Sequence, residues 1–134
     1  MILRTGIDLI EIQRIEALNP AIRERFLKRV FTETELRDSR GQFASLAGKF
    51  AIKEAVAKAL GCGIGPVSWQ EIEVRLGALG EPVLELHGAA LRISNQLGLQ
   101  DWSISISHTR THATALAVAI GAPALRSEDM SPGG

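Results

Sequence analysis

The fold is decided by one stretch, the segment from Gln42 to Gly61 with the sequence QFASLAGKFAIKEAVAKALG. It is the longest segment with helical periodicity. Its apolar side chains fall on one broad stripe, formed by Phe43, Leu46, Ala47, Phe50, Ala57 and Leu60. Gly61 then supplies the residue type that commonly ends a helix. The pattern therefore predicts a central core helix over residues 42–60, against which the rest of the chain packs.

The segments on either side of this helix predict a mixed fold. Ahead of it we expect a strand over residues 2–8 and a helical segment over residues 11–18. Another helical turn should begin at Pro20, and a short helix at the capping box Thr32 to Glu35. After it we expect four strands and one helix: strands over 71–76, 82–86, 102–108 and 112–120, and a helix over 88–97. This order predicts the α+β class, with an antiparallel sheet packed against the long helix.

The size and composition of the chain indicate one folded domain. Its 134 residues are 46% apolar and 22% charged, close to globular averages, which argues against a disordered, fibrous or membrane class. We expect the domain to span residues 1–121 and a flexible tail to span residues 122–134. One cysteine suits a reducing compartment, and no run approaches the roughly 20 apolar residues of a membrane span. These features predict a cytoplasmic protein that has no membrane partner.

The distribution of charge suggests one candidate interaction surface. Fifteen basic and fifteen acidic side chains cancel, so the overall charge gives no reason to expect nucleic-acid binding. Residues 13–30 are locally basic, with five arginines and lysines against two glutamates. This stretch can face an acidic partner, or it can be an ordinary solvated helix face whose arginines cover apolar surface. From the sequence alone the two interpretations have about even weight.

Three charged residues are candidates for a catalytic site. Glu54 falls on or beside the apolar stripe of the long helix, where an unpaired carboxylate is costly. Lys58, four residues later, can form an ordinary helical ion pair with it. Asp8 closes the first expected strand and can cap the helix that follows. If Asp8 and Glu54 meet in the fold, they form instead the kind of carboxylate pair that binds Mg²⁺ together with waters and substrate phosphates.

A histidine completes the set of candidates, and several familiar motifs are missing from the sequence. His108 continues the apolar face of the alternating segment 102–108, where a histidine is more often structural than catalytic. The sequence has no phosphate loop of the Walker type, no zinc-ligand spacing and no serine elbow of the hydrolase type. The residues alone therefore indicate no more than a magnesium-dependent enzyme that acts on a phosphate compound.

Three blocks of sequence, in this order, resemble the 4′-phosphopantetheinyl transferases, and specifically the short holo-acyl-carrier-protein synthases. The blocks are GIDLIEIQRI from Gly6 to Ile15, GKFAIKEAVAKALG from Gly48 to Gly61, and ISISHT from Ile104 to Thr109. Each block alone is a weak signal, whereas the three together at these separations are highly specific. The resemblance extends from about residue 2 to residue 120 and implies the fold of that family.

The resemblance implies a reaction and a set of site residues. Family members move the phosphopantetheine arm of coenzyme A to a serine of an apo acyl carrier protein and release adenosine 3′,5′-bisphosphate. Asp8 and Glu54 correspond to the Mg²⁺ ligands, and Lys58 to the lysine that neutralises or protonates the leaving phosphate. The positions that correspond to coenzyme A contacts are Lys49, Lys58, Gly80, Pro82, His108 and Thr109. Glu81 stands where the family usually has a lysine in a Gly-Lys-Pro turn.

The resemblance also implies partners. Acyl carrier proteins are acidic, so the basic stretch gains a partner, with the docking candidates Arg14, Arg23, Arg25 and Lys28. Short family members are homotrimers with sites between subunits, which places His108 and the helix residues of one site on different subunits. Two alternatives remain: a hydrolase that uses the same metal and lysine with water as nucleophile, and a carrier-binding module without turnover.

Overall fold

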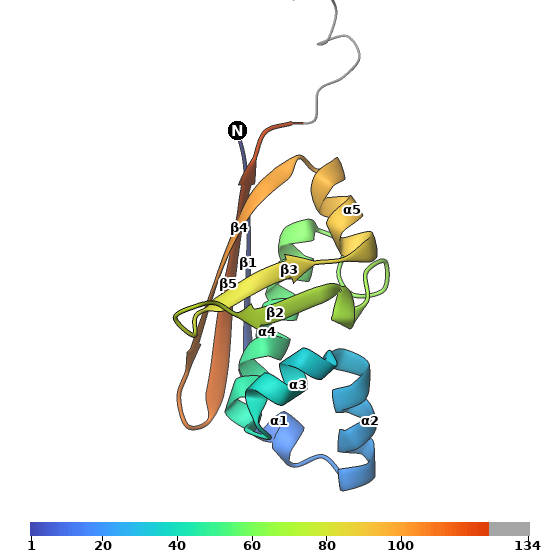
Figure 1. The fold of residues 1–134 in the computed structure, drawn as a ribbon, viewed down its shortest axis with the longest axis vertical. Coiled ribbons are helices and arrows are strands. Elements are labelled where there is room, and N and C mark those ends of the chain that lie inside the picture. Colours follow the sequence, from blue (N-terminus) through green and yellow to red (C-terminus); the bar gives the residue numbers. More distant parts are fainter. Residues whose placement is uncertain (124–134) are drawn as a thin grey trace, which may run out of the picture.

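A computed structural model describes residues 1–123 of the chain. Within this range the elements follow in the order β1 (Ile2–Glu11), α1 (Gln13–Glu16), α2 (Pro20–Val30), α3 (Glu33–Ser39), α4 (Phe43–Leu60), the 3₁₀ turn η1 (Trp69–Glu71), β2 (Ile72–Leu76), β3 (Pro82–Leu86), α5 (Gly88–Gln96), β4 (Leu99–His108) and β5 (His112–Gly121) (Figure 1). This architecture confirms the predicted α+β class. The tail expected over 122–134 lies outside the described residues from position 124 onward, and the domain boundary at residue 121 stays a prediction.

The strands form two antiparallel groups, and both groups contact α4. The main sheet has the strand order β1-β5-β4, and β2 pairs with β3 in a separate hairpin. Figure 1 shows the main sheet nearly edge-on, with α4 beside it and the hairpin crossing in front of α4. None of the helices in the described part is both long and apolar enough to span a membrane.

Local sequence signals set the starts of α2 and α3 and the end of α4. The side chain of Asn19 accepts a hydrogen bond from the backbone N–H of Ala21, and Pro20 begins α2. Thr32 and Glu35 form the predicted capping box at the start of α3. The long helix α4 ends at Gly61, whose φ of 76° is the left-handed conformation that glycine adopts without strain.

The first strand is longer than the sequence indicated. β1 remains paired with β5 from Ile2 opposite Gly121 to Glu11 opposite His112. The helical spacing that follows is realised in only the four residues of α1. Asp8 therefore lies inside a strand and does not cap a helix, so the capping interpretation of Asp8 is wrong.

Small residues let α4 lie unusually close to the main sheet. The inward positions of β1 and β5 include Gly6, Ala113, Ala115, Ala117 and Ala119, and the buried positions of α4 include Ala47, Gly48, Ala51, Ala55 and Ala59. A Cβ at Gly6 would overlap the carbonyl oxygen of Ala55, and one at Gly48 would lie 2.8 Å from Ile106. The backbones of β1 and α4 are thus in near contact, which brings their inward side chains together.

A buried ion pair joins α3, α4 and β2. The ammonium of Lys53 lies 2.8 Å from Glu35 Oε1, and both side chains are fully buried. Lys53 also donates to the backbone carbonyls of Trp69 and Ile72, and Glu35 Oε2 accepts from the backbone N–H of Val74. Burial lowers the pKa of Lys53, and the neighbouring Glu35 carboxylate opposes this effect. Both charges are therefore satisfied inside the protein.

We predict that Lys53→Ala lowers the free energy of unfolding by about 3–5 kcal/mol, because it leaves the Glu35 carboxylate buried without its counter-ion. Denaturant unfolding measures this difference. The control is Lys28→Ala, which removes an exposed pair with Glu24 and should cost less than about 1 kcal/mol. Equal effects of the two substitutions would contradict the central role of the buried pair.

Candidate active site

Asp8 and Lys58 meet where β1 crosses α4. The ammonium of Lys58 lies 3.2 Å from Asp8 Oδ1 and donates to the backbone carbonyl of Ile7 at 2.9 Å. Asp8 faces α4 because it lies two residues after Gly6, on the same side of the strand. The ion pair of Lys58 is thus made with the strand and not with Glu54, the helical partner that the sequence also allowed.

Glu54 lies one helical turn before Lys58 and faces the same region. It is partly buried, and this burial raises the pKa of its carboxyl. The negative charge of Asp8 raises the pKa further, while Lys58 acts in the opposite direction. Two carboxylates that line one cavity form a hard-oxygen donor set of the kind that fits Mg²⁺. The pair anticipated from the sequence is therefore brought together by the fold.

A cavity of about 360 Å³ lies beside this pair. Its polar lining comes from Asp8, Glu54 and Arg14, and its apolar lining from Leu9, Ile10, Ile15, Leu18, Phe26 and Phe50. The sequence identified the three polar residues but gave no reason to expect the apolar walls, which come from β1, α1, the turn after it, α2 and α4. We call this set the carboxylate cluster.

A second cluster contains most of the positions that correspond to coenzyme A contacts. Lys49, Gly80, Pro82 and His108 line a cavity of about 280 Å³ together with Asp38, Gln42, Ala44, Ser45, Val74, Leu76 and Ile106. Thr109 lies next to it, where its hydroxyl accepts hydrogen bonds from the backbone N–H groups of Thr111 and His112. We call this set the histidine cluster.

Lys49 is fixed by groups that the sequence did not single out. Its ammonium donates to Ser39 Oγ at 2.5 Å, to Ser45 Oγ at 3.2 Å and to the carbonyl oxygen of Glu35 at 3.4 Å. Burial lowers the pKa of Lys49, opposed by the charges of Asp38 and Glu35. The spacing of Ser45 and Lys49, one helical turn apart, was the available signal for this contact.

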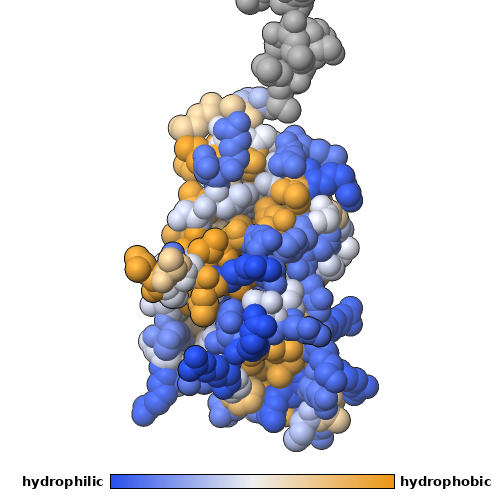
Figure 2. All heavy atoms as spheres, viewed as in Figure 1, coloured by the Kyte–Doolittle hydropathy of each residue, from blue (hydrophilic) through white to orange (hydrophobic). Residues whose placement is uncertain are grey.

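The turn from Gly80 to Pro82 contains Glu81, at the position where the resemblance leads us to expect a lysine. Glu81 Oε2 accepts a hydrogen bond from the backbone N–H of Leu79 at 2.8 Å. Gly80 has a φ of 81°, which favours glycine there. The Glu81 carboxylate thus folds back on its own turn at the end of the β2–β3 hairpin, and Figure 2 shows apolar atoms gathered at this end.

The two clusters lie on different flanks of α4. Glu54 and Lys49 are five residues apart, which separates them by about 140° around the helix. Lys58 returns to the side of Glu54, whereas Ser45 lies with Lys49. Among residues 1–123, the structure therefore does not bring His108 into the cavity that contains Asp8 and Glu54.

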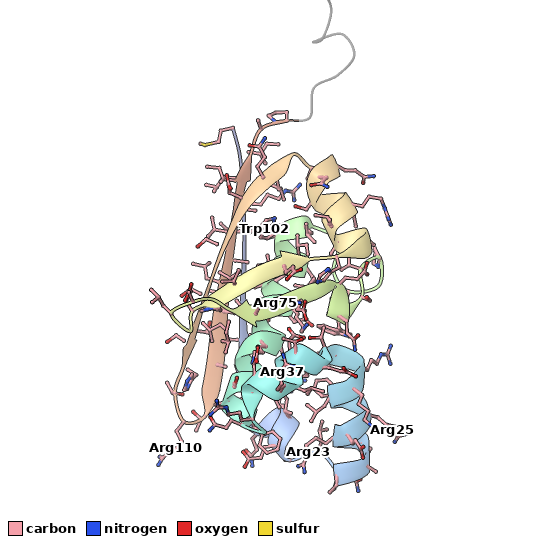
Figure 3. The ribbon with its side chains drawn as sticks, in the orientation of Figure 1. Arg23, Arg25, Arg37, Arg75, Trp102 and Arg110 are labelled. Carbon is pink, nitrogen blue, oxygen red and sulfur yellow. The ribbon has the colours of Figure 1, made fainter. Side chains whose placement is uncertain are left out.

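The four docking candidates differ in how firmly they are held. Arg23 donates to the carbonyl of Glu16 at 2.9 Å and its guanidinium lies 5.1 Å from the ring centre of Phe43. Lys28 pairs with Glu24 on the exposed side of α2. Arg14 lines the carboxylate cluster, and Figure 3 shows Arg25 extending outward from α2. Arg14 and Arg25 are thus the better placed of the four to meet a partner.

A family model described as the 4′-phosphopantetheinyl transferase superfamily matches residues 4–118 of the chain. The chain belongs to this superfamily. A holo-[acyl-carrier-protein] synthase of Herpetosiphon aurantiacus is 45% identical to it over 124 residues, which cover 87% of this chain and 98% of that protein. A synthase of the same name from Alkaliphilus metalliredigens is 46% identical over 125 residues, covering 89% and 99%.

Solved structures in the superfamily share the fold. The holo-[acyl-carrier-protein] synthase of Helicobacter pylori in complex with coenzyme A gives a TM-score of 0.79 at 33% identity, covering 87% of this chain and 99% of that one. The synthase of Neisseria meningitidis gives a TM-score of 0.79 at 34% identity, covering 87% and 97%. The comparisons confirm the family, the transferase class and the fold that the three sequence blocks implied.

Proposed function

We propose that this chain transfers the 4′-phosphopantetheine arm of coenzyme A to a serine of an apo acyl carrier protein. The products are the holo carrier protein and adenosine 3′,5′-bisphosphate. The observation that carries the proposal is a cavity lined by Asp8 and Glu54, with Lys58 paired to Asp8, in a chain of this superfamily. Two carboxylates for a metal and one ammonium for a phosphate are the charges that this transfer requires.

The roles of the three residues follow from their charges. The serine oxygen bonds to the phosphorus of the arm, the bond from that phosphorus to the bridging pyrophosphate oxygen breaks, and the serine proton leaves. Asp8 and Glu54 would hold Mg²⁺, which supplies charge neutralisation across the pyrophosphate when bound. Lys58 neutralises the leaving phosphate. Glu54 and a water held by the carboxylate pair are both candidates to accept the serine proton.

The nucleotide end of coenzyme A is assigned to the histidine cluster of a second subunit. Lys49 and His108 supply cationic or polar groups there, and Gly80, Pro82 and Thr109 supply turns with accessible backbone. Because α4 separates the two clusters within one chain, a complete site requires two copies. A homotrimer in which each copy contributes one cluster to each neighbour satisfies this requirement.

The outer face of the main sheet is suited to such an assembly. Five apolar side chains on it are between 40% and 65% exposed: Leu3, Ile7, Leu9, Leu116 and Ile120. Ile7 lies directly opposite Leu116 and Leu3 opposite Ile120, so the exposed residues adjoin across β1 and β5. A continuous apolar surface of this kind is typical of a subunit interface. We assign it to a second and third copy of this chain.

We assign helices α1 and α2 as the docking surface for the carrier protein. Arg14 and Arg25 offer guanidinium groups on the rim of the carboxylate cluster and on α2, where an acidic partner would bring its serine toward Asp8 and Glu54. Arg23 and Lys28 add positive charge to the same helix. The reducing, carrier-containing compartment implied by this substrate is the cytoplasm, with no nucleic acid or membrane as partner.

Incubation with coenzyme A, Mg²⁺ and an apo carrier protein should raise the mass of the carrier by about 340 Da, the mass of the arm. Glu54→Ala should abolish the gain because it removes a metal ligand, whereas Glu33→Ala, an exposed glutamate on α3, should not. Intact-protein mass spectrometry reads both results. If a competent carrier gained no mass, the proposal would be refuted in favour of a protein without turnover. If the nucleotide were released without any carrier, it would be refuted in favour of hydrolysis.

Mixed oligomers test whether the site is shared. Glu54→Ala and His108→Ala chains, each inactive alone, should recover about a quarter of wild-type activity when co-refolded in equal amounts, because one interface in four then combines two intact clusters. The measurement is transfer rate after size-exclusion purification of the oligomer. No recovery above the sum of the separate variants would place both clusters in one subunit's site.

Arg14→Ala should raise the KM for the carrier by about three- to tenfold and leave kcat nearly unchanged, because docking charges act on encounter and binding. Arg92→Ala, an exposed arginine on α5, serves as the control and should leave KM unchanged. Steady-state kinetics with varied carrier concentration measures both values. An unchanged KM for Arg14→Ala would count against α1 and α2 as the docking surface.

A further inference from the structure

We propose that Lys58 competes with the metal for Asp8 in the free protein, and that this competition makes metal and coenzyme A bind cooperatively. The inference rests on the proposed function, because it takes Asp8 and Glu54 as the metal ligands and coenzyme A as the substrate. It goes further, because it assigns Lys58 a second role before catalysis begins. In that role Lys58 controls the order in which the site fills.

The competition follows from where the ammonium lies. Lys58 donates to Asp8 Oδ1 at 3.2 Å and to the carbonyl oxygen of Ile7 at 2.9 Å, so two acceptors on β1 hold it against one of the proposed metal ligands. The Asp8 side chain is only 19% exposed, which leaves it few routes to turn away. The Lys58 side chain is 54% exposed and is attached to the last turn of α4, so the lysine is the partner that is able to move.

A divalent cation at Asp8 and Glu54 meets this ammonium as a like charge. The cation must either share Asp8 with Lys58 at close range or displace it toward solvent. Like charges a few ångströms apart near a protein surface repel strongly enough to weaken cation binding by roughly tenfold or more. The free protein is therefore expected to bind the metal weakly although its two carboxylates are well placed.

Coenzyme A removes this opposition. Its pyrophosphate carries negative charge that can accept the Lys58 ammonium, which frees Asp8 Oδ1 for the metal. The same pyrophosphate supplies additional oxygen ligands to the cation. Each ligand thus reduces the charge repulsion that weakens binding of the other. By linkage, coenzyme A tightens metal binding by the same factor as the metal tightens coenzyme A binding.

The test measures Mn²⁺ binding, with Mn²⁺ replacing Mg²⁺ because its free concentration is visible by electron paramagnetic resonance. The full-length protein is titrated with and without coenzyme A, after subtraction of the Mn²⁺ that coenzyme A binds alone. In the wild type, coenzyme A should tighten Mn²⁺ binding by about tenfold or more. Without coenzyme A, Lys58→Met should bind Mn²⁺ about tenfold more tightly than the wild type, and the effect of coenzyme A should shrink.

Three further variants isolate the cause. Lys58→Gln keeps a donor for the Ile7 carbonyl but removes the charge, so it should behave like Lys58→Met. Lys28→Met removes the same charge from the exposed pair with Glu24 and should leave Mn²⁺ binding unchanged. Asp8→Asn combined with Lys58→Met should lose the gain, which assigns the gain to this site and not to scattered surface carboxylates.

Unchanged or weaker Mn²⁺ binding by Lys58→Met, or an equal gain in Lys28→Met, would overturn the inference. These outcomes are separable from failure of the proposed function, because carrier modification is read independently by mass. A protein that modifies the carrier but shows no Lys58 effect on Mn²⁺ retains its function and loses this inference. A protein that shows the Lys58 effect but modifies no carrier has the competition without the proposed transfer.

Discussion

The close approach of β1 to α4 at Gly6 is the constraint on which the site depends. There is no room for a Cβ between Gly6 and the Ala55 carbonyl, so strand and helix meet backbone to backbone. Two residues further along β1, Asp8 then comes within ion-pair distance of a lysine on the helix. The placement of Asp8 beside Lys58 therefore depends on main-chain packing between β1 and α4. A larger residue at this contact would move Asp8 together with its strand.

A second interaction holds the other flank of α4. Glu35 acts at once as the capping residue of α3, the counter-ion of Lys53 and an acceptor for the backbone of β2. One carboxylate thus links α3, α4 and β2, and Lys49 on α4 donates to the carbonyl of the same Glu35 and to Ser39 on α3. The main sheet determines where the carboxylate cluster lies, and this buried pair determines where the histidine cluster lies, with α4 as the common reference.

The sequence predicted the elements well because each carries a local signal. Periodicity located α4, β3 and β5 to within about one residue, and Gly61 marked the end of the long helix. Local pattern could not show that β1 continues past Asp8, because its pairing with β5 joins residues about 100 positions apart. The same limit hid the Lys53–Glu35 pair and the partner of Lys58, since both are tertiary contacts. The residues of the site were found through resemblance, whereas their division between two flanks required the fold.

The division of the site by α4 has a consequence for how the protein works in a cell. The chain carries one cluster on each flank of α4, and the two clusters line separate cavities. Under the proposed shared site, specific activity depends on protein concentration and falls on dilution below the dissociation constant of the assembly. Newly made chains would stay silent until enough copies accumulate, so the level of expression sets the onset of carrier activation as well as its rate.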